Sequence, residues 1–262
     1  MTHKARKRFG QNFLQDLAVI ERLLAALRLQ PTDAVVEVGP GLGALTLPLL
    51  SRLEHLTVIE IDRDLIARLE ALRDDSLTII SGDVMQFDFS ALATRLSGTQ
   101  SSAHSLRVVG NLPYNIGTPL LIRLLDSHEA IRDVHVMLQK EVVDRLHASP
   151  GTRAFGRLSV LIQSVFDVQP LFTVAAEAFR PAPKIQSAVV RLTPLENAPD
   201  PCAMEALQAC TRLAFANKRK TLRNNLKGHL DENALRELQI DPQARAETLD
   251  LSAFHRMAAK LG

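Results

Sequence analysis

The chain has 262 residues, 46% of them hydrophobic, which suffices for one large α/β domain with a full core and a small appendage. No apolar run approaches the roughly 18 residues of a membrane helix, so we expect no membrane-spanning segment. The basic segment 3–8 is not followed by an apolar stretch, and Cys202 and Cys210 match no metal or redox spacing. We therefore expect a cytoplasmic protein with reduced thiols.

The net charge of +2 is too small for a protein that binds a polyanion over its whole surface. The basic residues nevertheless gather in two clusters, which are Lys4, Arg6, Lys7 and Arg8, and Lys218, Arg219, Lys220, Arg223 and Lys227. A single run of this kind is often only a solvated helix face. Two clusters at opposite ends of the chain favour a nucleic-acid footprint.

Strand-like and helix-like segments alternate through the first two thirds of the chain. Short β-branched or apolar runs predict strands at 34–38, 56–61, 77–80, 106–109 and 134–138. Helical spacing follows at 44–53, 65–72 and 140–147. This alternation predicts a parallel, doubly wound sheet with helices on both faces. Two later strand-like runs, 166–174 and 187–192, are expected to close the sheet as an antiparallel pair.

A proline-rich segment without periodicity, 193–201, predicts a linker. Beyond it, leucines recur among helix formers and no strand-like run follows. We therefore expect a catalytic domain at 1–193 and a small helical domain at 194–262.

Three of the predicted strands end in motifs suited to ligand binding, and ligands of such sheets bind beyond the carboxyl ends of the strands. The first strand runs into a turn with glycines at 39, 41 and 43, where the backbone can approach a ligand closely. Glu60 ends the second strand, and a carboxylate there can accept hydrogen bonds from ribose hydroxyls. Asp83 follows the third strand and could accept from an adenine amine.

The fourth strand leads into Asn111-Leu112-Pro113-Tyr114, which contains the only tyrosine of a chain without tryptophan. Asn111 offers a carbonyl oxygen, Pro113 fixes φ near about −65°, and Tyr114 offers a flat face for stacking. Such a device can grip a planar base that carries an exocyclic amine.

A nicotinamide-dependent dehydrogenase is a rival interpretation, because the glycine turn also satisfies the permissive dinucleotide pattern. Pro40, however, removes one N–H from a loop that would otherwise cradle a pyrophosphate. No Tyr–Lys or His–Asp arrangement for hydride chemistry is apparent. A non-catalytic RNA-binding assembly factor is a second rival, against which the presence of Asn111, Glu60 and Asp83 argues.

With these motifs in this order, the chain resembles the KsgA/RsmA family of ribosomal RNA adenine dimethyltransferases, relatives of the Erm methylases. The resemblance runs from Arg6 to about Leu261. It rests on the segments 8–14 (Arg-Phe-Gly-Gln-Asn-Phe-Leu), 38–43, 82–84, 111–114, 179–184 and 217–222, together with Glu60. Gln186, where we expect an acid, and Phe155, where a tyrosine is more usual, depart from the family pattern in positions that concern RNA contacts.

The resemblance implies a Rossmann-like methyltransferase fold, S-adenosylmethionine as cofactor and no metal. It assigns cofactor contacts to Asn12, Leu14, Gly39, Glu60, Asp83 and Asn111. It assigns the methyl-transfer motif to Asn111, Leu112 and Tyr114, with Phe179 stacking on the other face of the target base.

The implied reaction is dimethylation of the exocyclic amines of two adjacent adenines near the 3′ end of 16S ribosomal RNA, in the small subunit or its precursor. The implied enzyme is a monomer of the cytoplasm. The alternative within the same superfamily is an Erm-type methylase of 23S ribosomal RNA. The leucine of Asn-Leu-Pro-Tyr and the C-terminal helical region favour the ribosome-biogenesis branch.

Overall fold

The structure is a computed structural model that describes residues 11–72, 74–97 and 104–262. The chain forms two compact units, one of Met1–Val143 with Gln169–Pro194 and the other of Asp144–Val168 with Leu195–Gly262. Residues 144–168 therefore group with the C-terminal residues, although the sequence analysis placed them in the catalytic domain. Each compact unit is therefore built from two separate stretches of the chain, so no single boundary in the sequence divides them. The basic cluster at 4–8 lies outside the described residues.

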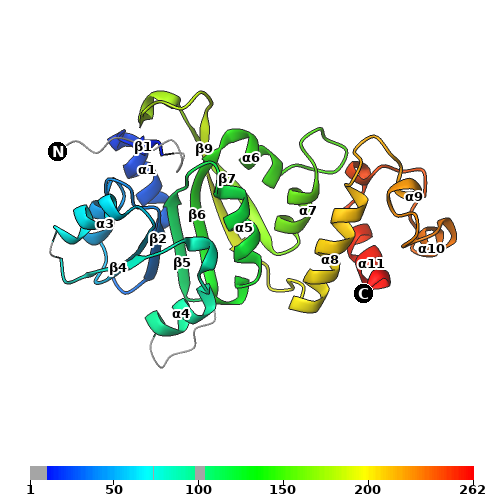
Figure 1. Cartoon of the computed structure of the whole chain (residues 1–262), viewed down its shortest axis with the longest axis horizontal. Coiled ribbons are helices and arrows are strands. Elements are labelled where there is room, and N and C mark those ends of the chain that lie inside the picture. Colours follow the sequence, from blue (N-terminus) through cyan, green and yellow to red (C-terminus); the bar gives the residue numbers. More distant parts are fainter. Residues whose placement is uncertain (1–10, 73, 98–103) are drawn as a thin grey trace. The chain divides into compact units, whose positions relative to one another are not determined.

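The first unit contains a seven-stranded sheet in the order β4-β3-β2-β5-β6-β9-β7 (Figure 1). Strands β2 to β6 pair in parallel, and β9 pairs antiparallel with β6. The bounds are β2 Ala34–Val38, β3 Leu56–Glu60, β4 Leu77–Ser81, β5 Leu106–Asn111, β6 Ile131–Gln139, β7 Phe166–Val174 and β9 Ser187–Pro194. The predicted doubly wound sheet is confirmed, and β2 has the predicted bounds.

Helices cover both faces of this sheet. The connecting helices are α1 Leu17–Leu27, α2 Thr46–Leu50, α3 Arg63–Glu70, α4 Phe89–Ser97, α5 Gly117–Leu125 and α6 Lys140–Leu146. Buried leucines of α1 pack in one cluster with Val35, Val58 and Val109. Because side chains alternate along a strand, the neighbouring Val36 faces the opposite side, where α4 packs against β2.

Helix α1 begins and ends at polar contacts. The Asp16 carboxylate accepts hydrogen bonds from the N–H groups of Ala18 and Val19 at 2.9 and 3.2 Å, which caps the first turn. At the other end, the Leu27 carbonyl accepts a hydrogen bond of 2.6 Å from Arg107. The short segment before the helix, β1 Phe13–Leu14, pairs antiparallel with β8 Phe179–Arg180, a pairing that the sequence did not predict.

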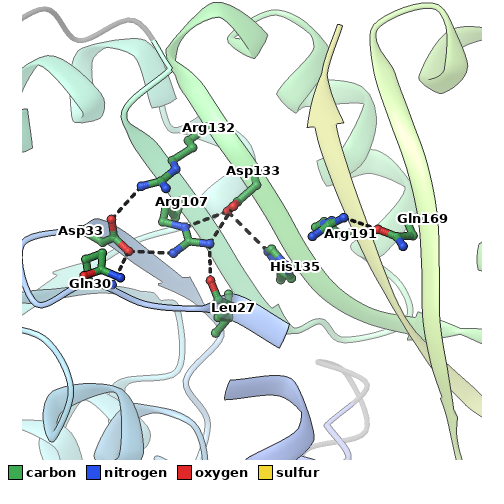
Figure 2. A network of polar contacts seen from close by, with 9 residues as sticks. All are labelled: Leu27, Gln30, Asp33, Arg107, Arg132, Asp133, His135, Gln169 and Arg191. Carbon is green, nitrogen blue, oxygen red and sulfur yellow. Dashed lines mark hydrogen bonds and ion pairs between the residues drawn. The ribbon is translucent and has the colours of Figure 1, made fainter. Parts of the chain in front are cut away.

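A buried ion network lies at the amino ends of β2, β5 and β6, centred on Arg107 (Figure 2). Arg107 donates to Asp133 through Nε and Nη2, at 3.0 and 2.7 Å, and to Asp33 through Nη1 at 2.7 Å. Arg132 donates to the second oxygen of Asp33 at 2.8 Å. The side chain of Arg107 is only 4% exposed, so this end of the sheet is held together by charges removed from water.

The second unit is helical in its C-terminal part, as predicted. Its helices are α7 Arg157–Gln163, α8 Pro201–Ala214, α9 Leu222–Asn225, α10 Glu232–Glu237 and α11 Leu251–Leu261. Buried residues of α8 and α11 form its core, and Phe215 stacks on Phe254 with ring centroids 5.5 Å apart. Asp200 and Asp250 cap the two helices through hydrogen bonds to Ala203 and Ala253 at 2.9 and 2.8 Å.

Candidate active site

A cavity of about 270 Å³ lies at the carboxyl ends of the parallel strands in the first unit. Strand order reverses between β2 and β5, and the cavity is lined by residues that follow β2, β3, β4 and β5. This is the position at which open α/β sheets bind ligands. Eight of the nine predicted site residues line it, namely Asn12, Leu14, Gly39, Glu60, Asp83, Asn111, Leu112 and Tyr114.

The glycine turn after β2 requires its glycines. Gly39 and Gly41 have φ angles of 68° and 60°, a region that residues with a Cβ rarely adopt. A Cβ on Gly41 would also stand 3.1 Å from the ring of Phe13, and one on Gly39 would stand 3.7 Å from Pro113. The turn therefore passes close under the N-terminal segment and beside the Asn-Leu-Pro-Tyr loop.

Glu60 is held by backbone donors at the end of β3. Its Oε1 accepts hydrogen bonds from Ile61 and Asp62, both at 2.9 Å, and its Oε2 accepts a longer one of 3.4 Å from Gly41. Burial raises the pKa of Glu60 above its usual range, against the opposing effect of these three N–H groups. Oε2 thus faces the cavity rim with acceptor capacity left for a ligand hydroxyl.

Glu37 is a site residue that the sequence analysis missed. It lies in β2, lines the cavity and is 1% exposed, and among the described residues its side chain accepts a single hydrogen bond, from the Thr46 hydroxyl at 2.7 Å. Burial raises its pKa to about 8, opposed by the bond from Thr46 and reinforced by the charge of Glu60. The available signal was a carboxylate inside the otherwise apolar run Ala-Val-Val-Glu-Val.

Asp83 follows β4 and uses one carboxylate oxygen to cap a short turn. Its Oδ1 accepts a hydrogen bond of 3.0 Å from the Met85 N–H. Oδ2 has no hydrogen-bond partner among the residues that the structure describes. One oxygen fixes the side chain, and the other remains available at the cavity.

Asn111 is the last residue of β5, paired with Met137 of β6, so the sheet fixes its backbone. Its Nδ2 donates to the Asn12 carbonyl at 3.0 Å. Because the amide nitrogen is held in this way, Oδ1 is left as an acceptor at the cavity. The Leu112 carbonyl beside it also accepts no hydrogen bond from the described part of the chain, while the Leu112 N–H donates to Met137 at 3.2 Å.

The two predicted stacking residues differ in position. Tyr114 is half-buried at the cavity, and its hydroxyl lies 2.8 Å from the Ser187 Oγ. Burial raises the pKa of Tyr114, against the lowering effect of this hydrogen bond. Phe179 does not line the cavity; it is 1% exposed and packs with Leu14 in the core. Its predicted stacking on a base stays a prediction, and this conformation offers no free face of the ring.

Within the described residues, no group of three or more His, Cys, Asp or Glu side chains could hold a metal ion. Over the same residues, no helix has the length and apolar character needed to cross a membrane. Cys210 is buried, which raises the pKa of its thiol to about 12, and Cys202 is exposed.

The second basic cluster lies in the second unit, in α9 and in the residues on either side of it. Arg223 pairs with Glu232 at 2.9 Å, and the Lys218 ammonium donates to the Arg153 carbonyl at 3.5 Å. Arg219 and Lys220 are exposed and form no ion pair with any described residue. These two cations are therefore available to an external anion.

Comparisons with known proteins identify the family of the chain. A family model described as ribosomal RNA adenine dimethylase matches residues 2–261. A protein of Methylobacillus flagellatus named ribosomal RNA small subunit methyltransferase A is 50% identical over 260 residues, which cover 98% of each chain. A protein of the same name from Laribacter hongkongensis is 50% identical over 262 residues, covering 99% of this chain and 97% of the relative.

Two solved structures share the fold at low sequence identity. A dimethyladenosine transferase from Plasmodium falciparum is 23% identical with a TM-score of 0.76, covering 94% of this chain and 95% of the other. The 23S rRNA methyltransferase ErmE is also 23% identical, with a TM-score of 0.68 and coverage of 95% and 99%. The fold is thus that of the Rossmann-like methyltransferases, and the chain belongs to the ribosomal RNA adenine dimethylase family.

Proposed function

We propose that the protein uses S-adenosylmethionine to dimethylate the exocyclic amines of two adjacent adenines near the 3′ end of 16S ribosomal RNA. The names of the relatives support the small subunit over the 23S substrate of the Erm alternative. The observation that carries the chemistry concerns Asn111, which lines the cavity and donates its Nδ2 to the Asn12 carbonyl, so that Oδ1 remains available as an acceptor.

The donor set of the cavity fits this cofactor. Glu37 and Glu60 are buried acids with no cation beside them among the described residues. Glu60 can accept hydrogen bonds from ribose hydroxyls, and the raised pKa of Glu37 would fall when a positively charged ligand lies close to it. We assign the ribose to Glu60, the adenine amine to the free oxygen of Asp83, and close backbone approach to Gly39. Asn12 and Leu14 would cover the ligand from the N-terminal segment. When bound, S-adenosylmethionine supplies an electrophilic methyl group on a sulfonium and leaves as a neutral thioether.

The protein's part in the transfer is to align and stabilise the attacking amine. The lone pair of an adenine amine is delocalised into the ring, which makes it a poor nucleophile. If Asn111 Oδ1 and the Leu112 carbonyl accept its two hydrogens, the nitrogen pyramidalises and its lone pair points along the line of transfer. The same oxygens stabilise the positive charge that builds on nitrogen. The methylated amine then loses its proton to water, so neither a strong base nor a metal is needed.

The test is Asn111→Ala, with Asn115→Ala as the matched control from the same loop. We expect Asn111→Ala to abolish methylation of small-subunit RNA while S-adenosylmethionine binds within about tenfold, since the lost contacts act mainly in the transition state. Asn115 lines the cavity but has no assigned role, so its variant should remain active. A fully active Asn111→Ala protein overturns the mechanism. If small-subunit RNA is still methylated in cells and extracts that lack the protein, the proposed function is overturned.

We further propose that the second unit contacts RNA phosphates through Arg219 and Lys220. Replacing both by Ala should weaken RNA binding and reduce the slope of log affinity against log salt by about 0.7–0.9 per lost phosphate contact. Arg236→Ala is the control, because Arg236 already pairs with Glu232 at 3.0 Å. An unchanged slope would show that Arg219 and Lys220 form only a solvated face.

We expect the active species to be a monomer located in the cytoplasm. Light scattering of the purified protein tests the monomeric state.

A further inference from the structure

Tyr114 is tethered by its hydroxyl to a residue that the assigned motif does not contain. The tyrosine lies in the loop after β5, whereas its partner Ser187 is the first residue of β9, 73 positions later in the chain. The two oxygens are 2.8 Å apart, within the usual range of a hydroxyl–hydroxyl bond. No other hydrogen bond ties the Tyr114 side chain to the described residues.

The Ser187 end of this bond is fixed by the sheet. Ser187 is fully buried and lies opposite Gln139 in the β6–β9 ladder. Directly before it, the Gln186 carbonyl accepts a hydrogen bond of 2.9 Å from the Lys140 N–H. The serine oxygen is therefore a rigid anchor, while the tyrosine belongs to a loop.

The tether fixes the direction of the ring. The phenolic oxygen lies on the Cβ–Cγ axis, so rotation about that bond leaves it in place, and only a change of the first side-chain torsion can move it. A hydrogen bond at that oxygen thus selects one rotamer of Tyr114. A ring held in that rotamer before the base arrives loses less conformational freedom on stacking.

We propose that Ser187 is a positioning residue that fixes the first side-chain torsion of Tyr114, and with it the place of the ring that stacks on the target adenine. The inference rests on the proposed function. Ser187 also follows the segment 179–184 along the chain, so the tether links the Asn-Leu-Pro-Tyr loop to the part of the chain just after the motif that contains Phe179.

The test is a double-mutant cycle with Tyr114→Phe and Ser187→Ala. Each single variant should lower kcat/KM for RNA about threefold to tenfold, the range expected for one net hydrogen bond. Both delete the same bond, so the double variant should be no worse than the poorer single variant. Multiplicative losses overturn the proposal. Ser187→Cys keeps the volume but offers only a weak donor, and it should resemble Ser187→Ala; activity like that of the unaltered protein would assign Ser187 to packing alone and overturn the tether.

A second measurement does not depend on turnover. Tyr114 is the only tyrosine and tryptophan is absent, so near-ultraviolet absorption follows its ionisation directly. The hydrogen bond from Ser187 lowers the pKa of Tyr114, so phenolate formation should move to higher pH in Ser187→Ala. An unchanged titration overturns the tether. A shifted titration in a protein without methylation activity would instead keep the tether and reject the proposed function.

Discussion

The two ends of the parallel sheet bury charged groups in opposite ways. At the amino ends, Arg107 lies between Asp33 and Asp133, and every carboxylate there meets a cation (Figure 2). At the carboxyl ends, Glu37 and Glu60 are similarly buried but meet only hydroxyl and backbone N–H donors. The paired charges at the amino ends hold the fold together, whereas the unpaired acids at the carboxyl ends remain available to a ligand.

The pKa values follow this difference. Burial by itself would raise the pKa of Asp133, but the hydrogen bonds and charges of His135 and Arg107 outweigh it and lower the pKa to about 2. Burial raises the pKa of Glu37 to about 8, because the Thr46 hydroxyl compensates only in part and no cation of the described residues pairs with it. The pKa of Asp133 therefore lies below the ordinary value of an aspartate, and the pKa of Glu37 lies above the ordinary value of a glutamate.

Removing the central cation should have the largest effect on stability. Arg107→Met removes the buried cation from Asp133 and leaves Asp33 with only the half-exposed Arg132, and we expect a loss of about 3–5 kcal/mol in the free energy of unfolding. Urea denaturation measures it. Arg132→Met is the control, because Arg132 is 51% exposed and its pair with Asp33 is worth about 1 kcal/mol or less. Equal losses in the two variants would contradict a structural role centred on Arg107.

At the cavity end, the same kind of change should affect ligand binding. Glu60→Ala should weaken S-adenosylmethionine binding by about 2–4 kcal/mol, because charge-assisted hydrogen bonds to ribose are lost. Calorimetry measures the affinity, and RNA binding without cofactor should hardly change. Glu54→Ala is the control, since Glu54 is exposed just before β3. Normal cofactor affinity in Glu60→Ala would remove Glu60 from the site.

The smallest expected effect concerns pH. The unfolded chain releases the Glu37 proton near pH 4.5, whereas the folded protein keeps it until about pH 8, so this group makes folding less favourable as pH rises between those values. Glu37→Gln should remove that decline and be more stable than the unaltered protein at pH 8. Denaturation at several pH values measures this.

Asp133 gives the contrast with the opposite sign. Its lowered pKa stabilises the folded protein above about pH 3.8, and this contribution is lost as pH falls toward 2.

The result that would contradict the Glu37 prediction is a Glu37→Gln protein less stable than the unaltered protein at pH 8. The ionised Glu37 carboxylate would then be stabilised in the folded state, and the two ends of the sheet would not differ in the way described.

Local sequence determined most of the fold. The run Ala-Val-Val-Glu-Val predicted β2 with its observed bounds, because strand formation there depends on neighbouring β-branched residues. The helix expected at 44–53 is shorter, Thr46–Leu50, since the glycine turn extends to its start. Strand β5 is longer than expected and includes Asn111, because the ladder with β6 continues to Met137.

The tertiary structure decided the states of the side chains in the site. Sequence motifs placed Asn111, Glu60, Asp83 and Tyr114 at strand ends that meet at one edge of the sheet, a consequence of parallel topology. Only the fold shows that the Asn12 carbonyl, 99 residues from Asn111, orients its amide, and that Phe179 is buried. It also shows that Glu37 has no cation beside it within the described residues and that the Tyr114 hydroxyl lies 2.8 Å from the Ser187 Oγ. Propensities and turns arise between neighbours along the chain, whereas burial and hydrogen-bond partners arise between residues distant in sequence.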